Sequence, residues 1–222
     1  MTKETCYMCD QPKTSGEHVP PKCLFPEKKD CEKGEGFRKN LIKVPSCDDH
    51  NSAKSQDDEF MLVTFVSNMF AERTGWYYQN SKLMRIVDRK PHLFAKLLKN
   101  STPLTIVDAD GNESDSCAFH LDRSRFANQM QCIANGVYYH HMGEKATGKT
   151  EVVPIQGFQT TSYKVNQNNQ KTKEYADRIF PNLPTYGDNP DIFYYQVSHN
   201  APEMMMKLVF YRYIEFVAVF NI

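Results

Sequence analysis

The sequence predicts an α+β protein in which a small head, residues 1–58, precedes a larger body, residues 59–222. The head is rich in Cys, Lys, Pro and Gly and lacks long periodic apolar runs. Such a segment buries too little apolar surface to fold without a metal or a disulfide. The body alternates helical and strand patterns, with the strands gathered toward the C-terminus.

The composition is that of an ordinary globular protein, with 40% hydrophobic and 24% charged residues among 222. Lys plus Arg equals Asp plus Glu at 27 each, so any binding of a polyanion has to rest on a local basic patch. The N-terminus lacks the apolar core of a signal peptide, and no run reaches the roughly 18 apolar residues of a membrane span. We therefore expect a cytoplasmic protein that does not bind membranes.

Two pairs of soft donors occur in the head, Cys6-Tyr-Met-Cys9 and Cys47-Asp-Asp-His50. In a reducing compartment, clustered cysteines are better interpreted as metal ligands than as disulfides. Three thiolates and an imidazole suit tetrahedral zinc, and four protein ligands leave no open position for water. The sequence therefore predicts a structural zinc bound by Cys6, Cys9, Cys47 and His50.

The cysteines leave other possibilities open. Cys6 and Cys9 could be unrelated thiols or form a disulfide, and Cys23 or Cys31 could take the place of a zinc ligand. Cys117 and Cys132 lie in the body, where we expect them to be buried small apolar side chains.

The residues between and behind these pairs indicate a chemical centre. Glu17 can supply a hard oxygen ligand for Mg²⁺ or Mn²⁺, and His18 can titrate near neutral pH and take a proton from an attacking water. Asn51 directly follows the second zinc pair, so its amide oxygen is a second hard ligand at a fixed place. The alternatives are a surface Glu-His pair and an Asn51 that caps a helix.

In order, the chain contains CxxC, Glu-His-Val-x-Pro, Asn-Leu and CxxH-Asn-x-x-Lys-Ser. This set resembles the HNH (ββα-metal) endonuclease family, in particular its zinc-containing branch, from Cys6 to about Asp58. The resemblance implies a ββα-metal fold for the head and hydrolysis of phosphodiester bonds in DNA with one divalent ion, Mg²⁺ or Mn²⁺. It also implies a role in restriction, phage or anti-phage systems.

The resemblance assigns roles to individual residues. His18 matches the general base, Asn40 the residue that orients the loop of this base, and Lys54 a basic residue near the substrate phosphate. Glu17 and Asn51 match the metal ligands, although Glu is longer than the usual Asp. His50 stands where Cys is common in the family, so it could face the catalytic metal instead of the zinc.

In the body, apolar spacing predicts helices at 57–73, 91–100 and 122–141, the last closed by Gly143. Strands are predicted at 103–107, 151–162, 191–198 and 207–220, the last two pairing across 199–203. The polar stretch 166–173 is predicted to be a loop.

The body shows no second catalytic motif. Adjacent helical histidines point about 100° apart, so we expect His140 and His141 to pack at a helix end and not to share a metal. We also expect the aromatic C-terminal strands to form a core or an interface and not to stack bases. The body would then select a target or bind a partner subunit or a second copy.

Two other function classes remain open. The first is a non-catalytic zinc-knuckle module that binds nucleic acid or protein. The second is a toxin-like or effector subunit that becomes active only with a partner or a small-molecule signal.

Overall fold

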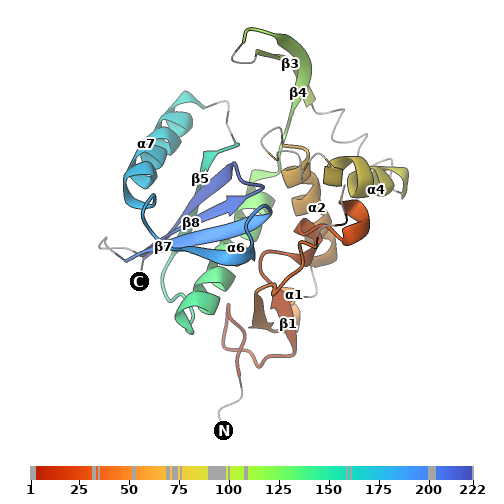
Figure 1. Ribbon diagram of the computed structural model, residues 1–222. Coiled ribbons are helices and arrows are strands. Elements are labelled where there is room, and N and C mark those ends of the chain that lie inside the picture. The colour runs from red at the N-terminus through yellow and green to blue at the C-terminus, as the bar shows by residue number, and fades with distance from the viewer. Residues whose placement is uncertain are drawn as a thin grey trace.

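The computed structural model describes residues 4–31, 34, 36–51, 54–68, 71, 75, 77–89, 99, 101–107, 110–158, 160, 162–199 and 204–221. It is a mixed α+β fold, as predicted. In Figure 1 the head lies beside the helices and sheet of the body, and the β3–β4 hairpin extends away from both.

Two short antiparallel strands and a helix follow one another in the head. Strand β1 (Ser15–His18) pairs with β2 (Lys43–Ser46), with His18 opposite Lys43. Helix α1 (Asp48–Asn51) begins directly after β2, and α2 (Lys54–Val66) comes next. The chain between the strands forms two short 3-10 turns, η1 (Lys22–Leu24) and η2 (Lys28–Asp30). A ββα-metal head requires two strands followed by a helix, as found here. Many unrelated small folds have the same order of elements.

The body is built on a five-stranded antiparallel sheet with the order β5-β9-β8-β7-β6. Its strands are Thr150–Gln156, Thr185–Asn189, Phe193–Ser198, Met204–Phe210 and Ile214–Phe220, numbered β5 to β9 along the chain. Apolar side chains of β7, β8 and β9 pack with α2 and α6 in one cluster, whereas α7 packs with Met205 and Val217 in another. Because side chains alternate along a strand, the two clusters cover opposite faces of the sheet (Figure 1).

Several predicted elements are confirmed. Helix α6 (Arg123–Met142) begins at Asp122, whose side chain accepts a hydrogen bond from the backbone of Arg125, and ends at Gly143 with φ 77°. Strands β7 and β8 pair as predicted, and the strand predicted at 103–107 lies in β3 (Ser101–Val107), which pairs with β4 (Glu113–Phe119). Of the helix predicted at 91–100, only residue 99 is described, and it is helical.

The stretch 207–220 contains parts of two strands, because a turn at 211–213 separates β8 from β9. Tyr211 and Arg212 occupy this turn with φ of 46° and 68°, a conformation for which Gly or Asn is the usual signal. The buried Tyr211 hydroxyl donates to the Leu24 carbonyl at 2.6 Å, so a contact distant in sequence holds a turn that has no local signature.

The prediction that 166–173 is a loop is wrong. These residues lie in helix α7 (Tyr163–Ile179), which Ser162 caps by accepting a hydrogen bond from the backbone of Val165. Only Ala176 within the helix is buried, and together with Phe180 it packs on the sheet. A helix attached by so narrow an apolar stripe can carry Asn, Gln and Lys over the rest of its surface.

Several elements have no counterpart in the sequence prediction. Among them are strand β4, the π-helical turn η3 (Gln79–Leu83), helix α4 (Met84–Arg89) and the edge strand β6. Cys117 and Cys132 are half-buried, not fully buried as predicted. His141 packs edge-on against the rings of Tyr186 and Tyr195, as expected for a histidine at a helix end.

The head packs directly on the body. Leu24 and Phe25 belong to the same buried cluster as α2, α6 and the sheet, and Tyr139 of α6 packs against the cluster around Cys6 and Val19. Within the described part of the chain, no helix is long and apolar enough to cross a membrane.

Helix α6 packs tightly against the head at Gly136. A Cβ added there would lie 2.6 Å from Cγ1 of Val19, a buried and stiff side chain. Gly136→Ala would gain about 1 kcal/mol of helix propensity, but the overpacking costs about 1–3 kcal/mol. We expect a net loss of unfolding free energy of up to about 2 kcal/mol in chemical denaturation.

The control for this prediction is the same substitution in a Val19→Ala background, which removes the two nearest contacts and leaves only the Val19 Cβ at 3.0 Å. Gly136→Ala should destabilise this background less than it destabilises the wild type. If Gly136→Ala changes the stability of both backgrounds equally, Val19 does not pack against Gly136 as described.

Candidate functional site

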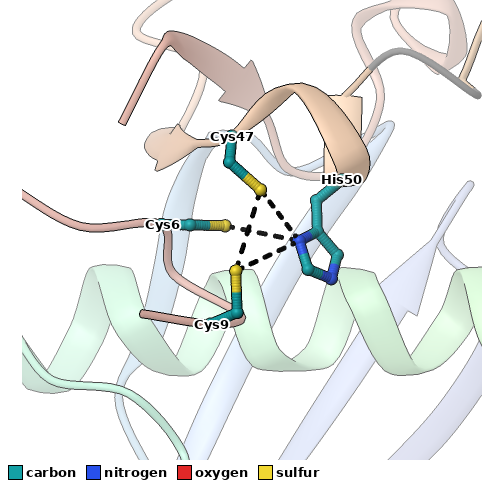
Figure 2. Close-up of side chains that lie close together, drawn as sticks. All are labelled: Cys6, Cys9, Cys47 and His50. Carbon is teal, nitrogen blue, oxygen red and sulfur yellow. Dashed lines mark hydrogen bonds between the residues drawn. The ribbon is translucent and has the colours of Figure 1, made fainter. Parts of the chain in front are cut away.

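Cys6, Cys9, Cys47 and His50 converge as the sequence predicts. Their ligand atoms all lie within 4.8 Å of one another. Figure 2 shows Cys6 and Cys9 on the N-terminal loop, and Cys47 and His50 on the segment that leads into and forms α1. The loop is held beside β2 because the backbone N–H of Tyr7 donates to the Pro45 carbonyl at 2.8 Å.

The spacing of these atoms fits a tetrahedral ion. Zinc–sulfur and zinc–nitrogen bonds of about 2.3 and 2.0 Å at tetrahedral angles require separations of about 3.8 Å between sulfurs and about 3.6 Å between sulfur and nitrogen. The Cys9 and Cys47 sulfurs are 3.7 Å apart. His50 Nδ1 lies 3.6, 3.6 and 3.2 Å from the sulfurs of Cys6, Cys9 and Cys47. These four residues could therefore bind one metal ion.

The structure does not support the alternative roles of the cysteines, a disulfide between Cys6 and Cys9 or a ligand role for Cys23 or Cys31. All seven cysteines are free, so the structure contains no Cys6–Cys9 disulfide. The thiols of Cys23 and Cys31 donate to the backbone carbonyls of Asp58 and Glu27 at 3.1 and 3.3 Å, and neither belongs to the cluster.

The backbone around Cys6 favours the thiolate that a metal requires. Burial raises the pKa of this thiol, but hydrogen bonds from the backbone of Met8, Cys47 and Cys9 lower it by more, so the net pKa lies below its usual value. The Met8 N–H lies 3.4 Å from the Cys6 sulfur. Such hydrogen bonds stabilise the deprotonated ligand before an ion binds.

Glu17 lies inside the head, with 2% of its surface exposed. Its Oε1 accepts a hydrogen bond from the Tyr7 hydroxyl at 3.0 Å, and its Oε2 accepts one from the Ser46 hydroxyl at 3.1 Å. Both carboxylate oxygens therefore accept hydrogen bonds from residues that are next in sequence to Cys6 and Cys47 of the donor cluster.

His18 lies on the other face of β1, because neighbouring residues of a strand point to opposite sides. It is half-buried and stands opposite Lys43 in the strand pair. Its pKa is lowered, first by burial and then by the positive charges of Lys22, Lys43 and Arg38.

Gly16 makes room for one of these charges. A Cβ at this position would lie 2.3 Å from Cε of Lys43, so the lysine stem crosses the bare backbone on the side of the strand that His18 shares. No sequence motif assigns Lys22, Arg38 or Lys43 an individual role. The register that sets His18 opposite Lys43 is the signal that would have identified this lysine.

The other predicted site residues lie in different surroundings. The amide nitrogen of Asn51 donates to the Ser15 hydroxyl at 2.7 Å and so ties α1 to β1. The Asn40 side chain donates to Asp188 of the body at 2.6 Å, a contact that the expected role in orienting the loop of His18 does not include. Lys54 begins α2, and its side chain lies outside the described part of the structure.

No protein-family model matches the chain, and no curated protein or solved structure is detectably similar to it. Its function therefore has to be argued from the site.

Metal binding can be tested directly. We expect the purified protein to bind one equivalent of zinc, and Cys9→Ser or His50→Ala to lose most of it because each removes one of four donors. Removing zinc with a chelator should also lower the thermal unfolding temperature, since the ion joins two segments that are distant in sequence.

Elemental analysis of the purified variants checks the first result and calorimetry the second, with Cys117→Ser as the control thiol. Equal zinc content in Cys9→Ser, His50→Ala and the wild type would contradict the assignment.

Proposed function

We propose that the protein hydrolyses phosphodiester bonds in DNA, with His18 as the general base. The observation that carries this proposal is the position of His18 on a short hairpin, half-buried and close enough to Lys22, Lys43 and Arg38 for their charges to lower its pKa.

These surroundings suit the chemistry. A phosphodiester is an anion, and clustered lysine and arginine side chains attract it by charge. A lowered pKa keeps the imidazole neutral near pH 7, the form that can accept a proton from water. The local cluster also provides the basic patch that a chain with no net charge requires.

The basic surface continues beyond the hairpin. An open pocket of about 390 Å³ is lined by Pro26, Glu27, Lys28, Gly36, Arg38 and Lys39. Because Arg38 both lines this pocket and contributes to the charge around His18, a bound strand could extend from the hairpin into the pocket.

In this proposal the ion held by Cys6, Cys9, Cys47 and His50 is zinc, and its contribution is structural. Three thiolates and an imidazole are the soft donors that zinc favours. The ion fixes the loop and α1 at the end of the β1–β2 hairpin that carries His18.

The resemblance also implies a hard divalent ion, Mg²⁺ or Mn²⁺, which would stabilise negative charge on the phosphate when bound. Of its implied ligands, Asn51 is half-buried beside Ser15. Glu17 does not fit, because its carboxylate is buried and both of its oxygens accept internal hydrogen bonds. We therefore derive no step of the reaction through this ion.

The internal position of Glu17 is also the observation that favours the second candidate, a non-catalytic zinc-knuckle module that binds DNA through the same basic face. Cleavage of a supercoiled plasmid distinguishes the two candidates.

We expect the purified protein to nick or linearise supercoiled plasmid in the presence of Mg²⁺ or Mn²⁺, and His18→Ala to cut about 10²–10⁴-fold more slowly because the general base is gone. Gel electrophoresis of time courses measures the rate, and a gel-shift assay checks that His18→Ala still binds DNA.

His140→Ala is the matched control, since it removes an imidazole from the body. Wild-type and His18→Ala rates that are equal would rule out His18 as the base. Cleavage that starts only when a cell extract is added would indicate a partner-dependent effector.

The pH dependence of cleavage follows from the charges around His18. The base works when neutral, so the rate should rise with pH through a pKa below the usual value of 6.5. Lys22→Ala or Lys43→Ala removes a repelling charge and raises this pKa, which moves the acidic limb of the profile to higher pH.

Lys13→Ala, a lysine paired with Glu4, should leave the profile unchanged. An acidic limb that stays in place in both Lys22→Ala and Lys43→Ala would show that His18 does not control it.

A further inference from the structure

Glu17 connects the two halves of the metal centre. One of its hydrogen-bond donors, Tyr7, follows the ligand Cys6 in sequence, and the other, Ser46, precedes the ligand Cys47. A single carboxylate thereby joins the loop that carries Cys6 and Cys9 to the strand that leads to Cys47 and His50.

We infer that Glu17 is a positioning residue of the zinc centre and not a ligand of a catalytic ion. This inference rests on the proposed zinc and is independent of the nuclease activity. It assigns Glu17 a structural task that the Glu-His pair in the sequence did not suggest.

The hydrogen bonds from Tyr7 and Ser46 to Glu17 matter for stability because all three residues are buried. Glu17, Tyr7 and Ser46 are 2%, 2% and 0% exposed, so water does not readily replace any of these hydrogen bonds. A buried polar group that loses its partner carries the full cost of desolvation. The Ser46 hydroxyl has a second acceptor, the Cys47 carbonyl at 3.3 Å. The Tyr7 hydroxyl, at 3.0 Å from Glu17, is therefore the stronger of the two links to the ligand-bearing segments.

Backbone contacts reinforce the same geometry. The Tyr7 N–H donates to the Pro45 carbonyl at 2.8 Å, and the Thr14 N–H donates to the Ser46 carbonyl at 3.0 Å. The loop is thus tied to β2 by backbone hydrogen bonds, and Glu17 adds a side-chain link at the level of the metal ligands. Groups that hydrogen-bond a metal ligand set its orientation, and their loss usually costs about 10–100-fold in metal affinity. Glu17 acts one residue further out, through Tyr7 and Ser46, so its loss should cost less.

Because side chains alternate along β1, the position of Glu17 also affects His18. Glu17 faces the zinc centre and His18, the next residue, faces the basic surface. The zinc centre and the proposed general base therefore occupy opposite sides of one strand, so loosening of Glu17 also disturbs the backbone that carries His18.

Zinc release from the purified full-length chain tests this role. We expect Glu17→Ala to transfer zinc to a colorimetric chelator up to about 10-fold faster than the wild type, the lower end of the cost of losing a group bonded to a ligand. Glu17→Gln should give an intermediate rate, because an amide can still hydrogen-bond to both hydroxyls. Tyr7→Phe should also accelerate release, and adding it to Glu17→Ala should have little further effect because the two residues act through one contact.

Glu4→Ala is the matched control, since Glu4 is an exposed acid on the same loop that pairs with Lys13. Its zinc release should equal that of the wild type. If Glu17→Ala does not fold, Glu17→Gln and Tyr7→Phe provide the same comparison.

Wild-type zinc release in Glu17→Ala together with loss of Mg²⁺-dependent cleavage would overturn the inference and make Glu17 a catalytic metal ligand. Equal acceleration by Glu4→Ala and Glu17→Ala would overturn it as well. A wild-type protein that cuts no DNA would refute the proposed nuclease and leave the zinc-release comparison intact.

Discussion

The head depends on the meeting of four donors from two segments that are 38 to 44 residues apart in sequence. The intervening chain is polar and forms only short elements, so its conformational entropy opposes this closure. A soft ion held by three thiolates and an imidazole would supply enough free energy to offset it. The β1–β2 hairpin, which carries Glu17 and His18, lies between the two donor pairs in sequence and is positioned where they meet.

A strand of only four residues separates two chemically different environments. The side that carries Glu17 is buried among hydroxyls, apolar side chains and thiolate ligands. On the side that carries His18, the charges of Lys22, Lys43 and Arg38 lower the pKa of this histidine. A chain without net charge can therefore still gather positive charge locally, although Glu27 pairs with Arg38 at 3.1 Å and offsets part of it.

Local patterns explain what the sequence could predict. The spacing of CxxC and CxxH was enough for the donor cluster, and Asp122 and Gly143 were enough for the limits of α6. Helix α7 was missed because one narrow stripe around Ala176 attaches it. The partners of Glu17 were missed because they depend on which face of β1 is buried, and this face is set by long-range packing.

The body contributes more to the site than its lack of motifs suggests. Asn189 at the end of β6 accepts from the backbone N–H of Lys39 at 3.2 Å and donates to its carbonyl at 2.7 Å, and Asp188 binds the side chain of Asn40. Arg38 directly precedes these two residues and Lys43 follows shortly after them. The edge strand of the sheet therefore fixes the segment that supplies two of the three charges around His18. Because the body positions these charges, it contributes to the proposed catalytic face. This contribution is separate from any role of the body in binding a target or a partner.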